Sequence, residues 1–324
     1  MDGDNGAASR YSPATSTASS HQPAQGRMIP SSLVTRGAPI LFVLLWSTGW
    51  IAAGYSAPHA DPLTFLVVRY ACAAALMGLI ALAFRAAWPT SAAGWVHPLV
   101  AGMLLHGIYL GGVWWAVRHG LPAGISGLIA GLQPILTAAF APLLVGERIG
   151  PVRWAGIAIG FAGILLVLAP KLAGVSGEAL WAVLIPILVN VAGMFAVTFG
   201  TFYQKRFQQT GDLRTLTALQ YVGAVAVTLP IALALEPMVI RWNLTMALVL
   251  FWSVVVLSLG AVGLLLFLIR RGEVSRAASL IYLVPVAVAV EAFILFGERL
   301  TPVQLAGMAL TVLGVVLASR QGAR

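Results

Sequence analysis

The chain has few charged residues and almost no cysteine for its length. Only 9% of its 324 residues are charged, whereas an average soluble domain carries roughly a quarter. The single cysteine, Cys72, excludes an intramolecular disulfide and a cysteine-based zinc cluster. The sequence has neither a Walker G-x-x-x-x-G-K-[ST] pattern nor an H-E-x-x-H pattern, which argues against an ATP-driven pump and a zinc protease. We therefore predict no metal site, no cofactor and no catalytic residues.

Long apolar segments make up most of the chain. Apolar residues account for 60% of it, the mean hydropathy is +0.92, and the alternation typical of β-strands is absent. A bilayer accepts only helices or closed barrels, and a helix needs about 20 apolar residues to cross it. The sequence thus predicts an all-α membrane protein with ten transmembrane helices. Their approximate ranges are 37–57, 62–84, 96–116, 121–144, 151–169, 177–203, 213–235, 244–269, 274–296 and 301–319.

Charge and polarity predict the orientation of the chain. Residues 1–36 are rich in Ser, Thr, Ala and Pro, and we expect them to form a disordered cytoplasmic tail. With that tail inside, fourteen Lys and Arg residues fall on the cytoplasmic side and four on the other. The positive-inside rule then places both termini, including residues 320–324, in the cytoplasm. The net charge of +9 is explained by orientation, so we expect membrane lipids and not nucleic acid as partners.

A charged turn occurs twice. GERIGPVRWAG at 146–156 returns as GERLTPVQLAG at 297–307, and 15 of 37 positions match when residues 132–168 are shifted by 151. The chain therefore reads as two five-helix repeats, at 37–169 and 177–319. An odd number of crossings starts the second repeat on the opposite side, so we expect inverted repeats, an arrangement typical of secondary transporters.

The two turns have a simple structural interpretation. Glycine ends one helix, proline starts the next, and the charged pair between them lies in the wet interface. The residues predicted to form these hairpin turns are Gly146, Glu147, Arg148, Gly297, Glu298 and Arg299.

Two ionisable residues fall inside predicted membrane helices, where a charge costs about 2.5–3.5 kcal/mol. Arg69 lies about 10 Å and Glu291 about 8 Å below the external face. Equal depth predicts a pair that forms an external gate or couples transport to protons; a static bridge, or outward snorkelling of Arg69, is the alternative. Gln220 aligns with Arg69 in the second repeat and is the predicted internal counterpart.

Polar and aromatic side chains near mid-depth predict a cavity. His106 suits proton coupling, although a neutral His bonded to Tyr109 or to a carbonyl is equally consistent. The amides Gln133 and Asn190 lie close to prolines, so their helices can bend around a cavity that the amides line. Alternatively, the two amides only form hydrogen bonds that join neighbouring helices. Two tryptophans four apart share one helix face and either line the cavity or pack. The predicted cavity residues are Trp46, Trp50, His106, Tyr109, Gln133, Asn190 and Tyr282.

Several motifs resemble the drug/metabolite transporter superfamily of EamA type. They are WSTGW (46–50), DPLTFLVVRY (61–70), HGIYLGGVWWAVRHG (106–120), GLQP (131–134) and the paired GER turns. The resemblance covers nearly everything after residue 36. It implies a ten-helix carrier of the bacterial inner membrane that exports amino acids or related metabolites.

The predicted function is secondary transport of a small organic solute by alternating access. Export of metabolites or drugs is favoured by the resemblance, an importer or facilitator is the alternative, and protons are a candidate coupling ion. The functional unit is a monomer or a homodimer. An intramembrane enzyme is a distant alternative, because the five histidines are scattered and no nucleophile–base cluster is visible. A structural or sensory module would lack a polar cavity between the repeats.

Overall fold

The structure is a computed structural model that describes residues 31–208, 210–261, 264 and 282–319. These residues are helical apart from turns and one isolated bridge between Ala60 and Ile240. The helices occur in the order α1 (Ser31–Ser56), α2 (Pro62–Ala83), α3 (Ala92–Gly102), η1 (Met103–Ile108), α4 (Tyr109–Arg118), α5 (Ala123–Ile129), α6 (Leu132–Val145), α7 (Pro151–Leu172), α8 (Glu178–Phe207), α9 (Leu213–Leu235), α10 (Leu244–Phe251), η2 (Trp252–Ala261), α13 (Val284–Phe296) and α14 (Pro302–Ala318).

Six of the described helical stretches are long and apolar enough to cross a membrane. Four shorter apolar helices accompany them, at Ile40–Ser56, Leu244–Gly260, Val284–Phe296 and Pro302–Ala318. The protein is therefore an all-helical, multi-pass membrane protein, as the composition predicted. One boundary differs: α1 begins at Ser31, inside the predicted tail. The rest of that tail and the C-terminal 320–324 lie outside the described residues. So do residues 274–281 of the predicted helix 274–296, and residues 262–263 and 265–269 of the predicted helix 244–269.

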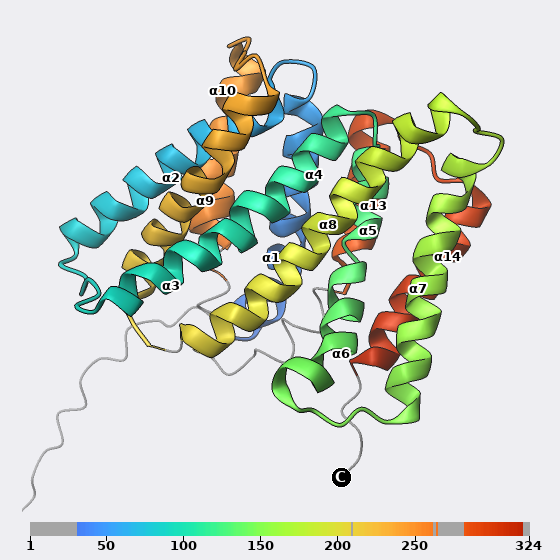
Figure 1. The fold of residues 1–324 in the computed structure, drawn as a ribbon, viewed down its shortest axis with the longest axis horizontal. Coiled ribbons are helices and arrows are strands. Elements are labelled where there is room, and N and C mark those ends of the chain that lie inside the picture. Colours follow the sequence, from blue (N-terminus) through green and yellow to red (C-terminus); the bar gives the residue numbers. More distant parts are fainter. Residues whose placement is uncertain (1–30, 209, 262–263, 265–281, 320–324) are drawn as a thin grey trace, which may run out of the picture.

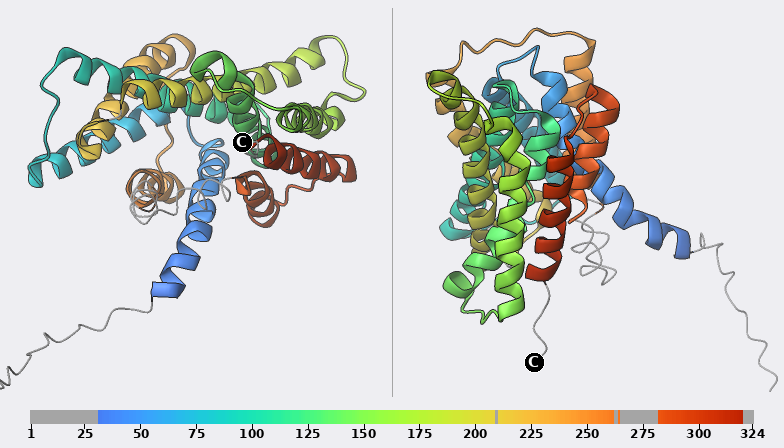
Figure 2. Two further views of the ribbon diagram at one scale, coloured as in Figure 1. Left: turned by 90° about the horizontal axis from the view of Figure 1, so that it is seen from below. Right: turned by 90° about the vertical axis from the view of Figure 1, so that its right-hand side faces the viewer.

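The helices form a row with a second group packed on one of its sides (Figure 1). The view from below in Figure 2 shows α2, α3, α8, α9 and α7 along the row, and α1, α10, α13 and α14 on the other side. Helix α1 packs against α13 and η2, so the start of the first repeat lies among helices of the second. Four of the described helices, α2, α7, α13 and α14, have proline in their first turn, where the missing N–H is not needed.

Helices α7 and α14 pack through small residues. The backbones approach so closely that a Cβ on Gly163 would lie 2.7 Å from the carbonyl oxygen of Gly307, and one on Gly156 would lie 2.8 Å from that of Gly314. The two helices are therefore antiparallel. The two contacts are equivalent, because residues 151 positions apart correspond: Gly156 corresponds to Gly307, and Gly163 corresponds to Gly314. The interface thus presents the same surface from both helices.

A second contact joins equivalent residues. Tyr70 in α2 and Tyr221 in α9 are 151 positions apart, and their rings stack with centroids 6.2 Å apart. A contact between a residue and its own repeat counterpart lies on the axis that relates the repeats. Helices α2 and α9 pack along each other, so this axis passes between them.

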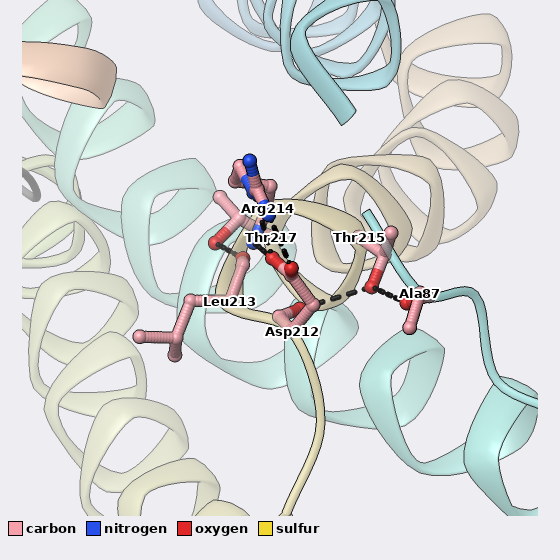
Figure 3. Close-up of polar contacts among 6 residues, drawn as sticks. All are labelled: Ala87, Asp212, Leu213, Arg214, Thr215 and Thr217. Carbon is pink, nitrogen blue, oxygen red and sulfur yellow. Dashed lines mark hydrogen bonds and ion pairs between the residues drawn. The ribbon is translucent and has the colours of Figure 1, made fainter. Parts of the chain in front are cut away.

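The N-terminus of α9 is anchored to the segment after α2 (Figure 3). Asp212 is the N-cap residue, and its carboxylate accepts hydrogen bonds from the backbone N–H of Arg214 at 2.9 Å and from the Arg214 guanidinium at 2.6 Å. The Thr215 hydroxyl lies 3.1 Å from the carbonyl oxygen of Ala87 and 2.9 Å from that of Asp212. The cap residue of α2 at the matching position is also aspartate, Asp61.

This cap predicts a small pH effect on stability. The hydrogen bond from the Arg214 side chain lowers the pKa of Asp212 from 3.8 to about 2. A depressed pKa stabilises the fold above the unfolded value, and that contribution is lost as the pH falls through the folded value. Both side chains are partly exposed to solvent, which screens the interaction, so we expect the contribution to be small. Unfolding temperatures of the wild type and Asp212→Asn can be compared between about pH 5 and pH 2. The difference between the two proteins should become smaller as the pH falls. A difference that stays constant would show that the Asp212 carboxylate does not stabilise the fold through its charge.

Candidate functional site

A cavity of about 40 Å³ opens where both halves of the chain meet. It lies between α1, α4, the junction of α5 and α6, the start of α13, and α14. Its wall is formed by Trp46, Trp50, Tyr109, Ala130, Gly131, Gln133, Pro134, Tyr282, Val284, Pro285, Thr311, Val312 and Val315. The wall is aromatic and apolar with a few uncharged polar groups, which is the usual make-up of a small-molecule site.

An interrupted helix forms one side of this cavity. Helix α5 ends at Ile129 and α6 begins at Leu132, with a turn at Ala130 and Gly131. Pro134 explains the break, because its ring excludes a helical bond to the carbonyl of Ala130 four residues earlier. The backbone N–H of Gln133 donates to that carbonyl instead, at 3.1 Å. The sequence predicted a bend here; the structure has a break.

The second repeat contributes the equivalent positions to the opposite wall. Gly131 and Tyr282 are 151 apart, as are Gln133 and Val284. Pro134 and Pro285 complete the set, and Pro285 lies in the first turn of α13. The cavity is therefore bounded by the same stretch of both repeats. The two stretches differ in polarity, because the first has the amide of Gln133 at the position where the second has Val284.

Five of the seven predicted cavity residues lie on this wall. They are Trp46, Trp50, Tyr109, Gln133 and Tyr282. The geometry brings these side chains together from α1, α4, α6 and the turn before α13. Their role in binding stays a prediction.

His106 lies elsewhere, in the π-helical segment η1. Its ring stacks on Tyr221 with centroids 4.7 Å apart. The neighbouring Gln220 side chain donates from Nε2 to Oε1 of Gln208 at 3.0 Å. The Tyr70 hydroxyl donates to the His106 carbonyl oxygen at 2.8 Å. The predicted partner Tyr109 faces the cavity, and its backbone N–H donates to the carbonyl oxygen of His106, but no bond between the two side chains occurs among the described residues. His106 and Gln220 thus belong to the contact between α9 and η1 and not to the cavity wall.

Asn190 is also off the cavity wall. It is fully buried in α8, and its amide Nδ2 lies 3.5 Å from the carbonyl oxygen of Ser126 in α5. Its Oδ1 and the Ser126 hydroxyl have no hydrogen-bond partner among the described residues. Asn190 therefore contacts the short helix α5 from α8, outside the cavity wall.

Arg69 and Glu291 do not pair in this structure. The Arg69 side chain is 95% buried, its guanidinium carbon lies 5.7 Å from the centroid of the Trp114 ring, and its Nε has no partner. Glu291 instead contacts Ser47, with 2.6 Å between Oε1 and Oγ. The ion pairs among the described residues are Arg153 with Glu147 and Arg214 with Asp212.

The predicted external pair was therefore wrong for this conformation, and the reason is lateral position. Depth along a helix can be estimated from the sequence, but α2 packs against α9 and α4, whereas α13 packs against α5 and α1. Similar depth does not place two side chains side by side when their helices have different neighbours.

The two GER turns share a backbone and differ in what their acids bind. Gly146 and Gly297 both end a helix with φ of 68°, in the left-handed region where glycine is favoured. Both acids were expected in the wet interface; Glu147 is exposed and pairs with Arg153 at 3.2 Å. Glu298 departs from that prediction. It is half-buried and accepts hydrogen bonds from the N–H groups of Ala123 and Gly124 at the start of α5. Arg148 and Arg299 are exposed.

Comparisons with known proteins agree on one family. The model of the EamA-like transporter family matches residues 38–169 and again 184–320. The chain is 29% identical to an uncharacterised transporter, YvbV, of Bacillus subtilis, over 87% of this chain and 91% of the relative. It is 26% identical to a probable amino-acid metabolite efflux pump of Salmonella typhimurium, over 86% and 92%. A protein of known crystal structure shares the fold, with a TM-score of 0.60 and 20% identity over 89% of this chain and 98% of that one.

Proposed function

The chain belongs to the EamA-like transporter family, and we propose that it is a secondary carrier that exports a small organic metabolite by alternating access. It is a transporter and not an enzyme. The observation that carries the mechanism is the cavity bounded by equivalent stretches of both repeats. Because a relative is called a probable amino-acid metabolite efflux pump, amino-acid derivatives are the first substrates to test.

Inverted repeats are the second part of the proposal. We propose ten membrane helices in two five-helix repeats, with both termini in the cytoplasm of a bacterium. The antiparallel packing of α7 on α14 supports this, since equivalent helices of inverted repeats run in opposite directions. The two separate family matches support the same division. Cysteine labelling at positions 148 and 299 tests it: opposite compartments are expected, and labelling from one compartment would overturn the inversion.

The size of the cavity bears on the conformation. A site for a small molecule usually has about 300–1,000 Å³, whereas this cavity has about 40 Å³. The conformation therefore corresponds to a constricted state, and substrate entry requires the repeats to move apart. Arg69 is the proposed gate residue, since a buried cation that forms no ion pair among the described residues is poised to attract an anionic group during that movement. Gln220 is the proposed uncharged gate residue of the second repeat.

Transport by the reconstituted carrier tests the proposal. Proteoliposomes are loaded with a panel of amino acids, amines and nucleosides, and efflux is followed with and without a pH gradient. Efflux of at least one class above the rate of protein-free vesicles is expected. Equal rates for every solute would contradict the proposed function.

A cavity variant should change substrate affinity without unfolding the protein. Trp46→Ala removes an aromatic wall, and a loss of about 1.4 kcal/mol corresponds to a tenfold rise in KM for efflux. Trp181→Ala is the matched control, because Trp181 lies on α8 and is 60% exposed. The control is expected to keep the wild-type KM. Equal KM values for the two variants would remove Trp46 from the binding site.

A further inference from the structure

Ser47 makes two contacts that one hydroxyl proton cannot supply. It is fully buried in α1. Its Oγ lies 2.9 Å from the carbonyl oxygen of Leu44 and 2.6 Å from Oε1 of Glu291. A serine hydroxyl carries a single proton and two lone pairs, and a backbone carbonyl only accepts. Both contacts are full two-centre hydrogen bonds when the Ser47 proton points to Leu44 and the carboxyl group of Glu291 supplies the other proton.

The surroundings of Glu291 favour that neutral form. Helix α13 packs against α1 and α5. Helix α5 has no titratable side chain, and the described side chains of α1 include one, Tyr55, whose ring lies 4.9 Å from that of Phe296. The other nearby acid is Glu298, which holds the N-terminus of α5. No Lys or Arg among the described residues forms an ion pair with Glu291.

Glu291 is half-buried, and an ionised carboxylate in this position would have no compensating charge among the described residues. Its second oxygen, Oε2, is buried and lacks a hydrogen-bond partner in the described part of the chain. A buried charge without a partner is costly in a membrane, whereas a neutral acid with one hydrogen bond is not.

We propose that Glu291 is a proton-binding site of the carrier and that Ser47 holds its proton-loaded form, so that export is exchanged for protons. The inference rests on the proposed transport function. Ser47 lies between Trp46 and Trp50 in sequence, and both tryptophans line the cavity. The state of the carboxyl group is thereby connected to the helix that forms the cavity wall. In each cycle the acid releases one proton on the cytoplasmic side, the carboxylate is left, and it takes up one proton on the other side.

Infrared spectroscopy tests the protonation directly. The full chain is reconstituted in lipid vesicles near neutral pH, and spectra of the wild type and Glu291→Gln are subtracted. We expect a carbonyl band of a protonated carboxylic acid that shifts in heavy water and is missing in the variant. In Ser47→Ala the band should move, because its hydrogen-bond partner is gone, whereas Ser47→Thr should retain it. A difference spectrum that shows only an ionised carboxylate would overturn the proposal.

Transport assays separate this inference from the function on which it rests. In Glu291→Gln, the stimulation of efflux by a proton gradient should be at least tenfold smaller than in the wild type. With equal pH on both sides, the variant should still exchange labelled for unlabelled solute. Glu178→Gln, an exposed acid in the first turn of α8, is the control and should keep both activities. Undiminished stimulation in Glu291→Gln would refute the proton site alone. Absence of exchange in the wild type for every solute would refute the transport function.

Discussion

Glu298→Ala should destabilise the protein by about 2 kcal/mol, the larger effect expected from the two GER turns. The carboxylate oxygens of Glu298 accept from Ala123 N–H at 2.9 Å and Gly124 N–H at 2.8 Å. These N–H groups lie at the start of α5 and have no partner within the helix. Their loss would also loosen the helix that ends at the cavity, so efflux should fall together with the unfolding temperature measured in detergent.

The matched control is supplied by the first repeat. Glu147 occupies the same position in the same turn, but its partner is Arg153 and its side chain is 53% exposed. Such a surface pair contributes roughly 0–1 kcal/mol, so Glu147→Ala should leave the unfolding temperature nearly unchanged. Glu298→Gln, which keeps one acceptor oxygen, should be intermediate. Equal shifts for the two alanine variants would show that Glu298 acts as an interface charge and not as a helix cap.

Gly163→Ala should destabilise the protein, because it adds a methyl group where α7 and α14 are in backbone contact. The new Cβ would lie 2.5 Å from the backbone nitrogen of Thr311 and 2.7 Å from the carbonyl oxygen of Gly307. Backbone atoms cannot rotate away, so α7 and α14 would have to separate. Overpacking of this kind costs about 1–3 kcal/mol, and the change should appear as a lower unfolding temperature in detergent.

Gly78→Ala in α2 is the control for that experiment. Nothing lies within 4 Å of its added Cβ, so the change should be neutral or stabilise the helix by up to about 1 kcal/mol. If both variants retain wild-type stability, the close approach of α7 and α14 is not required for folding. If both variants are destabilised equally, the loss of stability comes from replacing any helical glycine and not from the contact between α7 and α14.

Much of the helical framework could be predicted because its signals are local. Apolar length and proline positions gave 62–84 for α2, which spans Pro62–Ala83, and 213–235 for α9, which spans Leu213–Leu235. The left-handed conformation of Gly146 and Gly297 follows from glycine at a helix end. The cavity residues Gln133 and Tyr282 were identified from polarity at mid-depth beside proline.

The remaining features depend on contacts between distant segments. Glu298 and the N-terminus of α5 are 175 residues apart, and no spacing rule connects them. The separation of Arg69 from Glu291 depends on which helices are neighbours, which hydropathy does not encode. The π-helical segments η1 and η2, which occupy overlapping equivalent positions in the two repeats, also lack a simple sequence signal.

The stack of Tyr70 on Tyr221 has a consequence for descent. Each ring touches the residue that occupies its own place in the duplicated unit. A half-length ancestor that paired with an oppositely inserted copy of itself would have put this tyrosine against its twin, so one codon would have specified both sides of the contact. Fusion into a single gene would then have freed the two copies to diverge: Arg69 and Gln220 now differ at equivalent positions, whereas Tyr70 and Tyr221 are the same residue.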